Sequence, residues 1–334
     1  MKIPYVNLAR QWKIEKKKLL KILEKTLENE NWVGGKSIEL FEKKISKVCN
    51  TRYAVALNSG TDALTLALHL LGVKKGDEVI TTPNSFIAST AVIIHLGAKP
   101  VFVDVLPDQN MDPSKLEKAI TKKTKVIMSV HLTGRISEMN EILKISKKNN
   151  IPIIEDCAQS IGSKYSNKPS GSFGKVGCFS AHPLKNLNAI GDSGYLTTND
   201  KKIYDKVIEL RSHGMVNRDK INNFGYVSRM DSINASVLNF RLDNLEKVIK
   251  KRRLNFDLYQ EFLNKKYVYF PIENHNQYNT YHTFVIQVND RDNLRKYLKS
   301  KNIETAIHYP IPIHLQPAAR CLGYKRNNFI VAER

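Results

Sequence analysis

The chain has 334 residues, a formal net charge of +21 and four cysteines that lie far apart in the sequence. This length allows one large α/β domain with a smaller second one, and the spread cysteines argue against a disulfide framework. No apolar run approaches the ~18 residues of a membrane span, and the Met1 end has no apolar signal core. We therefore expect a reduced, soluble, cytoplasmic protein with no membrane partner.

Basic residues gather at 16–18 and 250–253, which are candidate patches for nucleic acid. Both clusters fall on predicted amphipathic helices, beside Glu and Leu and without interleaved aromatic residues. This pattern is typical of a solvated Lys-rich surface, so we expect no nucleic-acid partner. A positive field of this kind would attract small anionic substrates such as sugar nucleotides.

The N-terminal part predicts two helices, over 14–28 and 37–48, followed by a short buried strand over 54–57. The strand leads directly into Asn58-Ser59-Gly60-Thr61-Asp62 and a helix over 62–72. Free backbone N–H groups at such a helix start can bind a phosphate. An alternative is that Ser or Thr only caps the helix.

Strands and helices then alternate, which predicts a predominantly parallel sheet covered on both faces. The strands are expected at 78–82, 99–103, 125–130 and 152–155, and the helices at 86–97, 113–121 and 136–149. Ligands in such sheets bind beyond the carboxyl ends of the strands. Asp156 follows one of these ends, and Phe86 follows another.

Two further strands, over 176–180 and 194–198, flank a segment with a single lysine, Lys185, five positions after Ser180. The segment otherwise consists mainly of small, apolar and turn-forming residues. A partly desolvated lysine loses its proton more easily, and the neutral amine can form a Schiff base with an aldehyde. The alternative is an ordinary solvated loop lysine.

The rest of the chain predicts a change of architecture. We expect a helix over 200–211, an irregular loop over 215–229, one long helix over 231–253, strands at 267–270, 283–288 and 304–308, and a helix over 291–301. These elements predict a large domain over 1–245 and a small α+β domain over 246–334. The loop 308–317 has two His six positions apart without a nearby Cys or Glu, so we expect no metal site.

Several motifs in one order resemble the sugar aminotransferases of the DegT/DnrJ/EryC1/StrS family, which are fold type I pyridoxal-phosphate enzymes. The resemblance runs from Tyr5 to the last residues. Its motifs are NSGTDAL (58–64), EDCAQSIG (155–162), the step from Ser180 to Lys185, RSHGM (211–215), SRMD (228–231) and HYPIPIHLQP (308–317). The implied cofactor is pyridoxal 5′-phosphate.

The resemblance implies two catalytic residues. Lys185 would hold the cofactor aldehyde as a Schiff base and then move a proton between the substrate carbon and the cofactor. Asp156 would pair with the pyridine nitrogen of the cofactor and keep it protonated.

Five other residues would bind the cofactor by the same resemblance. Gln159 would hydrogen-bond the ring hydroxyl, and Phe86 would stack on the ring. Gly60, Thr61 and Ser180 would hold the phosphate through backbone amides and hydroxyls.

The implied reaction moves an amino group from an amino acid, expected to be L-glutamate, to a keto sugar linked to a nucleotide. The residues 186–192 (NLNAIGD) and the SRMD motif resemble members that act on 3-keto sugars, whereas His182 resembles those that act on 4-keto sugars. We expect a 3-keto-6-deoxyhexose. Alternatives are a 4-keto sugar, a cyclitol, or a non-catalytic regulatory homologue; the dehydratase branch, with His at the lysine position, is disfavoured by Lys185.

Members of the family form homodimers with shared active sites, and the same is expected here. They commonly carry Asn two residues before the Arg of the G-x-N-x-R loop, where this chain has Val227 before Arg229. That Asn reaches the cofactor phosphate of the neighbouring subunit, so Val227 is expected to weaken the contact between subunits. Members also continue beyond the 331–333 equivalent, so the small domain is expected to be incomplete.

Overall fold

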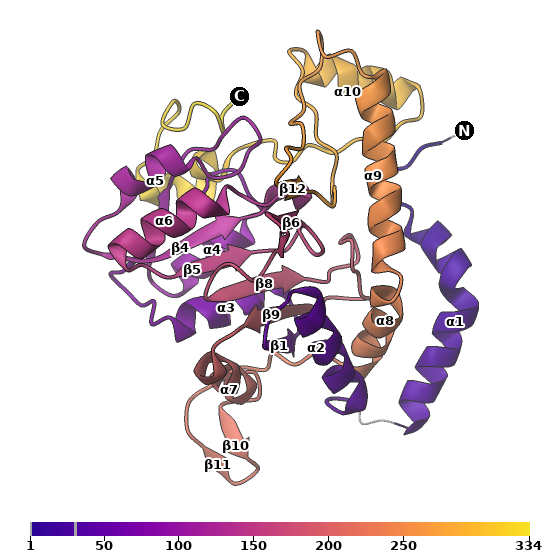
Figure 1. Ribbon diagram of the computed structural model, residues 1–334, viewed down its shortest axis with the longest axis vertical. Helices are drawn as coiled ribbons and strands as arrows, with labels where there is room; N and C mark the ends of the chain where they lie inside the picture. The colour runs from indigo at the N-terminus through magenta and orange to yellow at the C-terminus, as the bar shows by residue number, and fades with distance from the viewer. Residues whose placement is uncertain (1, 30–31) are drawn as a thin grey trace.

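A seven-stranded sheet forms the centre of the computed structural model, which describes residues 2–29 and 32–334 (Figure 1). The strands are β1 (Tyr53–Leu57), β2 (Glu78–Thr81), β3 (Lys99–Phe102), β4 (Thr124–Val130), β5 (Ile153–Asp156), β8 (Val176–Ser180) and β9 (Gly194–Thr198). Their order in the sheet is β1-β9-β8-β5-β4-β2-β3. The arrangement confirms the predicted α/β class with a mostly parallel sheet.

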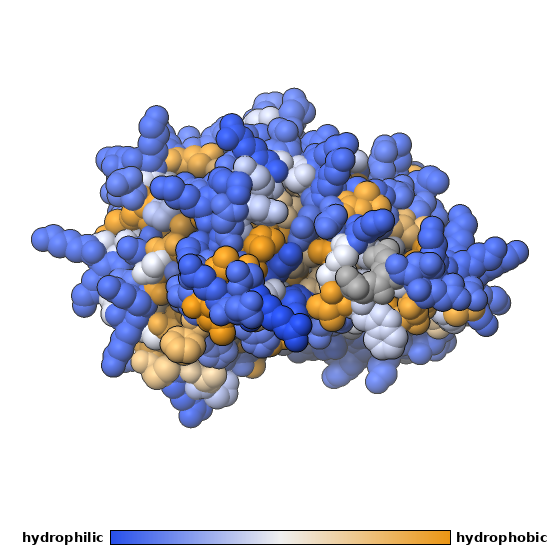
Figure 2. Space-filling view, turned by 90° about the horizontal axis from the view of Figure 1, so that it is seen from below, coloured by the Kyte–Doolittle hydropathy of each residue, from blue (hydrophilic) through white to orange (hydrophobic). Residues whose placement is uncertain are grey.

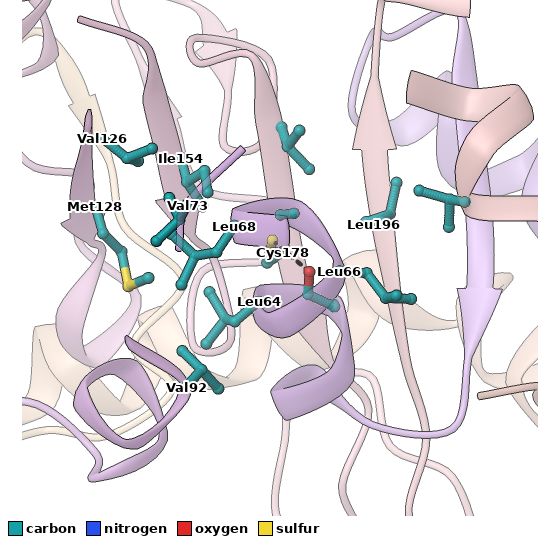
Figure 3. Packing of buried hydrophobic residues seen from close by; sticks show 14 of the residues in the cluster. Leu64, Leu66, Leu68, Val73, Val92, Val126, Met128, Ile154, Cys178 and Leu196 are labelled. Atoms are coloured by element: carbon teal, nitrogen blue, oxygen red, sulfur yellow. Dashed lines mark hydrogen bonds between the residues drawn. The ribbon is translucent and has the colours of Figure 1, made fainter. Parts of the chain in front are cut away.

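Helices cover both faces of the sheet, because side chains alternate along each strand and both sets are apolar. Met128 of β4 packs in one layer (Figure 3), whereas its neighbour Ile127 packs in the opposite layer. The first layer contains α3 (Gly60–Leu70), α4 (Ala88–His95) and α7 (Lys201–Leu210); the second contains α2 (Lys36–Val48), α5 (Pro113–Ala119), α6 (Met139–Asn149) and α8 (Ser232–Leu242).

Strand β9 runs opposite to its neighbours β1 and β8, whereas the other neighbouring strands of this sheet are parallel. The segment 181–193, which joins β8 to β9, therefore turns back at the edge where β1, β5 and β8 end. This topology places Lys185 at the carboxyl edge of the sheet, where α/β folds bind their ligands.

The predicted helix over 231–253 is wrong as a single element. It is divided into α8 and α9 (Leu245–Phe262), with the break at Asp243 and Asn244. The Asn244 side chain donates to the Phe240 carbonyl at 3.0 Å, and the Asn244 backbone N–H bonds instead to the Arg241 carbonyl. Local bonding of this kind competes with the regular helical ladder, which accounts for the break.

The C-terminal region contains the predicted helix, α10 (Arg291–Ser300), but the strands predicted at 267–270 and 283–288 are reduced to one isolated bridge, and the strand predicted at 304–308 is absent from these residues. Tyr269 pairs with Gln287, and Ile303 pairs with Ile3 near the start of the chain. Aromatic packing holds the region together: Phe256 of α9 contacts the rings of Tyr281 and Phe284. The region therefore packs through aromatic side chains and not through a continuous strand ladder.

The remaining elements are short, apart from the N-terminal helix, which lies beside α8. The predicted irregular loop over 215–229 contains a hairpin that extends away from the main sheet (Figure 1). No helix of the described residues is long and apolar enough to cross a membrane. The elements are α1 (Leu8–Asn29), η1 (Leu132–Gly134), β6 (Lys164–Tyr165), β7 (Lys168–Pro169), β10 (Met215–Asn217), β11 (Lys220–Ile221), β12 (Gln277–Tyr278), η2 (Ile313–Leu315) and η3 (Pro317–Leu322).

Candidate active site

The predicted phosphate-binding residues meet where α3 begins. Gly60 and Thr61 are the first residues of α3, and Ser59 caps the helix by accepting a hydrogen bond from the Asp62 backbone N–H at 3.0 Å. A Cβ added to Gly60 would lie 2.8 Å from the Cβ of Ser180, so only glycine allows this close approach. The first N–H groups of the helix and the Ser180 hydroxyl therefore lie together at the sheet edge, as an anion site requires.

Gly194 lies behind this turn and fixes its backbone. A Cβ at Gly194 would lie 2.2 Å from the backbone carbon of Ser59. The start of β9 must therefore be glycine for the α3 turn to sit against it. Gly194 was not among the predicted site residues, although its place after Asp192-Ser193 in the lysine segment was visible in the sequence.

Asp156 ends β5 and is almost completely buried. One carboxylate oxygen accepts a 2.7 Å hydrogen bond from the Ser89 hydroxyl, and the other accepts a 3.1 Å bond from the Ala158 backbone N–H. Ser89 lies in the first turn of α4, three residues after Phe86. Two donors hold the carboxylate in one orientation while leaving it lone pairs for a further donor, such as a protonated ring nitrogen.

The amine of Lys185 is buried near the Asp156 carboxylate. Among residues 2–29 and 32–334, no hydrogen bond or ion pair to its Nζ is found. Burial lowers the pKa of Lys185, and the negative charge of Asp156 partly opposes that effect. A desolvated lysine without a partner is suited to act as a nucleophile, because more of it is in the neutral form.

Gln159 connects the end of β5 to the C-terminal region. Its amide oxygen accepts a 2.8 Å hydrogen bond from the Thr133 backbone N–H, and its amide nitrogen donates to the Tyr309 hydroxyl at 3.2 Å. The Tyr309 ring lies 6.4 Å from that of Phe86, whose side chain is 56% exposed. The structure thus brings Phe86 and Gln159 to one mouth of the site.

Two contacts of this site were missed by the sequence reasoning. Ser89 belongs to no motif. The only signal in the sequence was its position three residues after Phe86, at the start of a predicted helix. Tyr309 stood in the motif 308–317 but received no role. Both became visible only through their hydrogen bonds to Asp156 and Gln159.

A second polar cluster, His131, Glu155 and Cys157, has donor atoms close enough to hold a metal ion. Its groups are already engaged in other bonds. Glu155 accepts hydrogen bonds from the backbone N–H groups of Gly171, Phe173 and Gly174 and makes a 3.0 Å contact with the His131 ring. Burial raises the pKa of Cys157 well above its usual value, which disfavours the thiolate that a metal would need. The cluster is therefore better explained as a hydrogen-bonded part of the core.

A family model described as the DegT/DnrJ/EryC1/StrS aminotransferase family matches residues 13–334. The chain belongs to this family. It is 37% identical to a dTDP-3-amino-3,6-dideoxy-alpha-D-galactopyranose transaminase of Aneurinibacillus thermoaerophilus, over 99% of this chain and 91% of the relative. It is also 35% identical to a pleiotropic regulatory protein of Geobacillus stearothermophilus, over 100% of this chain and 91% of the relative.

Solved structures agree with this assignment. The crystal structure of DesV from S. venezuelae superposes with a TM-score of 0.96 at 31% identity, covering 99% of this chain and 90% of that one. The chain is a fold type I aminotransferase that depends on pyridoxal phosphate. The residues present suit that cofactor, because the N-terminus of α3, a buried carboxylate and an amine with no partner in the described residues lie on one edge of the sheet.

Proposed function

We propose that this aminotransferase moves an amino group from L-glutamate to the keto carbon of a nucleotide-linked 3-keto-6-deoxyhexose. The observation that carries the reaction type is the position of Lys185, which lies at the carboxyl edge of the sheet near Asp156 and makes no hydrogen bond or ion pair in the described residues. Support for the 3-position comes from the lysine segment 186–192 and from the A. thermoaerophilus relative, whose name places the amino group at carbon 3. The basic surface suits an anionic substrate.

Each residue has a distinct task in the proposed reaction. Pyridoxal phosphate, when bound, supplies an aldehyde that takes the amino group and a ring that accepts electrons from the substrate carbon. The Lys185 amine would hold the aldehyde, with loss of water, and when released would carry a proton to and from the reacting carbon. The Asp156 carboxylate, oriented by Ser89 and Ala158, would keep the ring nitrogen protonated.

Cofactor binding is assigned to the rest of the site. Gly60, Thr61 and Ser180 would hold the phosphate, because the N-terminus of α3 offers backbone donors there. Gln159 would bond the ring hydroxyl, and Phe86 would cover the ring. These contacts are independent of the lysine amine.

We also propose that the active unit is a homodimer whose active sites are shared. The β10–β11 region exposes the whole side chain of Phe224 and more than half of Val227, and α1 leaves three quarters of Ile14 exposed. Apolar clusters also interrupt the mostly hydrophilic face seen in Figure 2. A second copy of the chain would cover such side chains and remove them from water.

Sedimentation velocity tests the dimer, with Phe224→Ser as the interface variant. We expect a dimer for the native chain, and a shift towards monomer with loss of activity for the variant. A fully active native monomer would refute the proposal.

A non-catalytic regulatory role is the second candidate, favoured by the name of the G. stearothermophilus relative. It predicts binding of cofactor without turnover. The intact Lys185 and Asp156 pair favours the enzyme.

The deciding experiment starts from purified protein and pyridoxal phosphate. A visible absorption band that L-glutamate removes would establish the first half of the reaction. The loaded protein is then incubated separately with 3-keto and 4-keto dTDP-6-deoxyhexoses, and products are identified by mass and NMR. Amination only at carbon 4 would overturn the position, and a band that no amino acid removes would favour the regulatory role.

A further inference from the structure

Arg252 of α9 is a half-buried arginine whose charge is not balanced by a carboxylate. Its hydrogen bonds run through Nη1, to the carbonyl oxygens of Tyr281 at 3.2 Å and His282 at 2.8 Å. In the described part of the chain, no acidic side chain forms an ion pair with it. The adjacent Arg253, in contrast, makes two 2.9 Å bonds to Glu273. The second edge of the Arg252 guanidinium is thus available to an external anion.

The segment that anchors Arg252 is also tied to the lysine loop. The side chain of Asn186, the residue after Lys185, donates to the Thr280 carbonyl at 3.2 Å. Thr280 lies two residues before His282. This bond joins the segment that contains Lys185 to the segment that contains His282. Lys185 is one residue from the bond, and His282 is two residues from it.

His282 lies among basic side chains. Burial, followed by the proximity of Lys185, Arg252 and His308, lowers the pKa of His282 well below its usual value. The neutral ring keeps one N–H to donate, and its buried Nδ1 has no hydrogen-bond partner among the described residues. Asp156, the carboxylate that acts on Lys185, is already held by Ser89 and Ala158. A small anion placed here would be attracted by the charge of Arg252 and could accept a hydrogen bond from the His282 ring.

We propose that Arg252 and His282 form a carboxylate subsite that receives a carboxylate of the amino donor. The proposal rests on the aminotransferase function above. The α-carboxylate of an amino acid is bonded to the same carbon as its reacting amine. It must therefore lie close to the Lys185 amine, whereas the pyrophosphate of a sugar nucleotide is separated from the keto carbon by the sugar ring. The carboxylate of a uronic sugar is the other possible source of the same chemistry.

The test measures the two half-reactions separately in Arg252→Gln. We expect the apparent Kd for L-glutamate to rise about 10-fold to 100-fold, as for the loss of a charged hydrogen bond. The half-reaction of the keto sugar, started from protein loaded with pyridoxamine phosphate, should stay within about twofold. Lys251→Gln is the matched control, because it removes one exposed positive charge from the same helix and should leave both half-reactions unchanged.

Binding of glutarate to the holoenzyme by calorimetry gives a readout independent of turnover, since glutarate has carboxylates but no amine. The affinity for glutarate should fall in Arg252→Gln and in His282→Gln. The histidine variant provides the test if the arginine variant does not fold. Unchanged glutarate binding in both folded variants would overturn the proposal. A defect confined to the sugar half-reaction would also overturn it and assign the subsite to the sugar. If the native protein shows no band that glutamate removes, the proposed function itself has failed.

Discussion

Two carboxylates stand side by side at the end of β5, and their surroundings differ. Glu155 points into the core, where the backbone N–H groups of Phe173 and Gly174 bond to one of its oxygens. Its other oxygen contacts the Gly171 N–H, the His131 ring and the Cys157 thiol. Asp156 points to the other side and has one protein donor at each oxygen. Adjacent strand residues face opposite sides of a sheet, which separates the two environments.

The difference teaches how to distinguish a structural carboxylate from a functional one. A saturated carboxylate can only hold the polypeptide together, because no lone pair remains for a ligand. A carboxylate with spare lone pairs is held in place and still able to bind. Substitutions on the two sides of β5 should therefore fail in different ways.

The largest effect is expected at Lys185, which lies near Asp156 in the segment between β8 and β9. Lys185→Ala should reduce turnover to background, because no other amine without a partner is positioned beside Asp156 in the described residues. Pyridoxal phosphate should still bind through its phosphate contacts. Steady-state assays and equilibrium dialysis measure the two quantities. Full activity of the variant would show that another group serves as the nucleophile.

The second largest effect is expected for Asp156→Asn. Its turnover rate should be lower by about 10²-fold to 10⁴-fold, because a neutral amide does not keep a ring nitrogen protonated. Its stability should fall by about 1 kcal/mol or less, since the Asn oxygen can still accept one of the two hydrogen bonds. Single-turnover kinetics and denaturant titration check both values. A near-normal rate would make Asp156 a purely structural residue.

Glu155→Gln is the matched substitution on the core side. One oxygen becomes an NH₂ group that faces hydrogen donors, so the free energy of unfolding should fall by roughly 3 kcal/mol. The folded fraction should retain its cofactor band. Urea titration beside Asp156→Asn gives the comparison, and equal stability losses in the two variants would contradict the distinction drawn here.

A smaller effect is expected in the pH dependence of cofactor capture. The neutral lysine reacts, and burial lowers the pKa of Lys185, so the capture rate should rise with pH and level off below the pH expected of a free lysine. Because the charge of Asp156 raises that pKa, Asp156→Asn should move the midpoint to lower pH. Glu155→Gln should leave it in place. Stopped-flow absorbance measures the midpoints; an upward shift in Asp156→Asn would reverse the assigned sign.

Much of the seven-stranded sheet and its covering helices could be predicted from the sequence because their signals are local. Alternating short apolar strands and amphipathic helices reveal a covered parallel sheet, and such a sheet has one edge for ligands. The motif around Lys185 and the strand ending at Asp156 therefore indicated the same place. The family match confirms the cofactor and the enzyme class. The detailed role of each site residue remains a prediction.

Other features depend on contacts between distant residues, which spacing does not encode. Nothing in the sequence indicated that the Ser89 hydroxyl would bond to Asp156; the position of α4 beside β5 determines this contact. The break at Asn244 depends on one side-chain bond to a carbonyl within an otherwise regular apolar stripe. In the C-terminal region, the apolar pattern of 283–288 indicated a strand. Side chains of this segment instead pack against Phe256, and no regular strand pairing is formed there.

The antiparallel strand β9 has a consequence for how the chain reaches this fold. Strand β1 lies at the edge of the sheet and pairs with β9, Tyr53 opposite Thr198 and Leu57 opposite Gly194. During synthesis at about 5–20 residues per second, β1 therefore leaves the ribosome on the order of ten seconds before its partner exists. In that interval an apolar edge strand has no neighbour, and the start of α3 has no Gly194 to rest against. The start of α3, where we propose that the phosphate binds, can therefore be completed only after Gly194 has been made, although Gly60 is made much earlier.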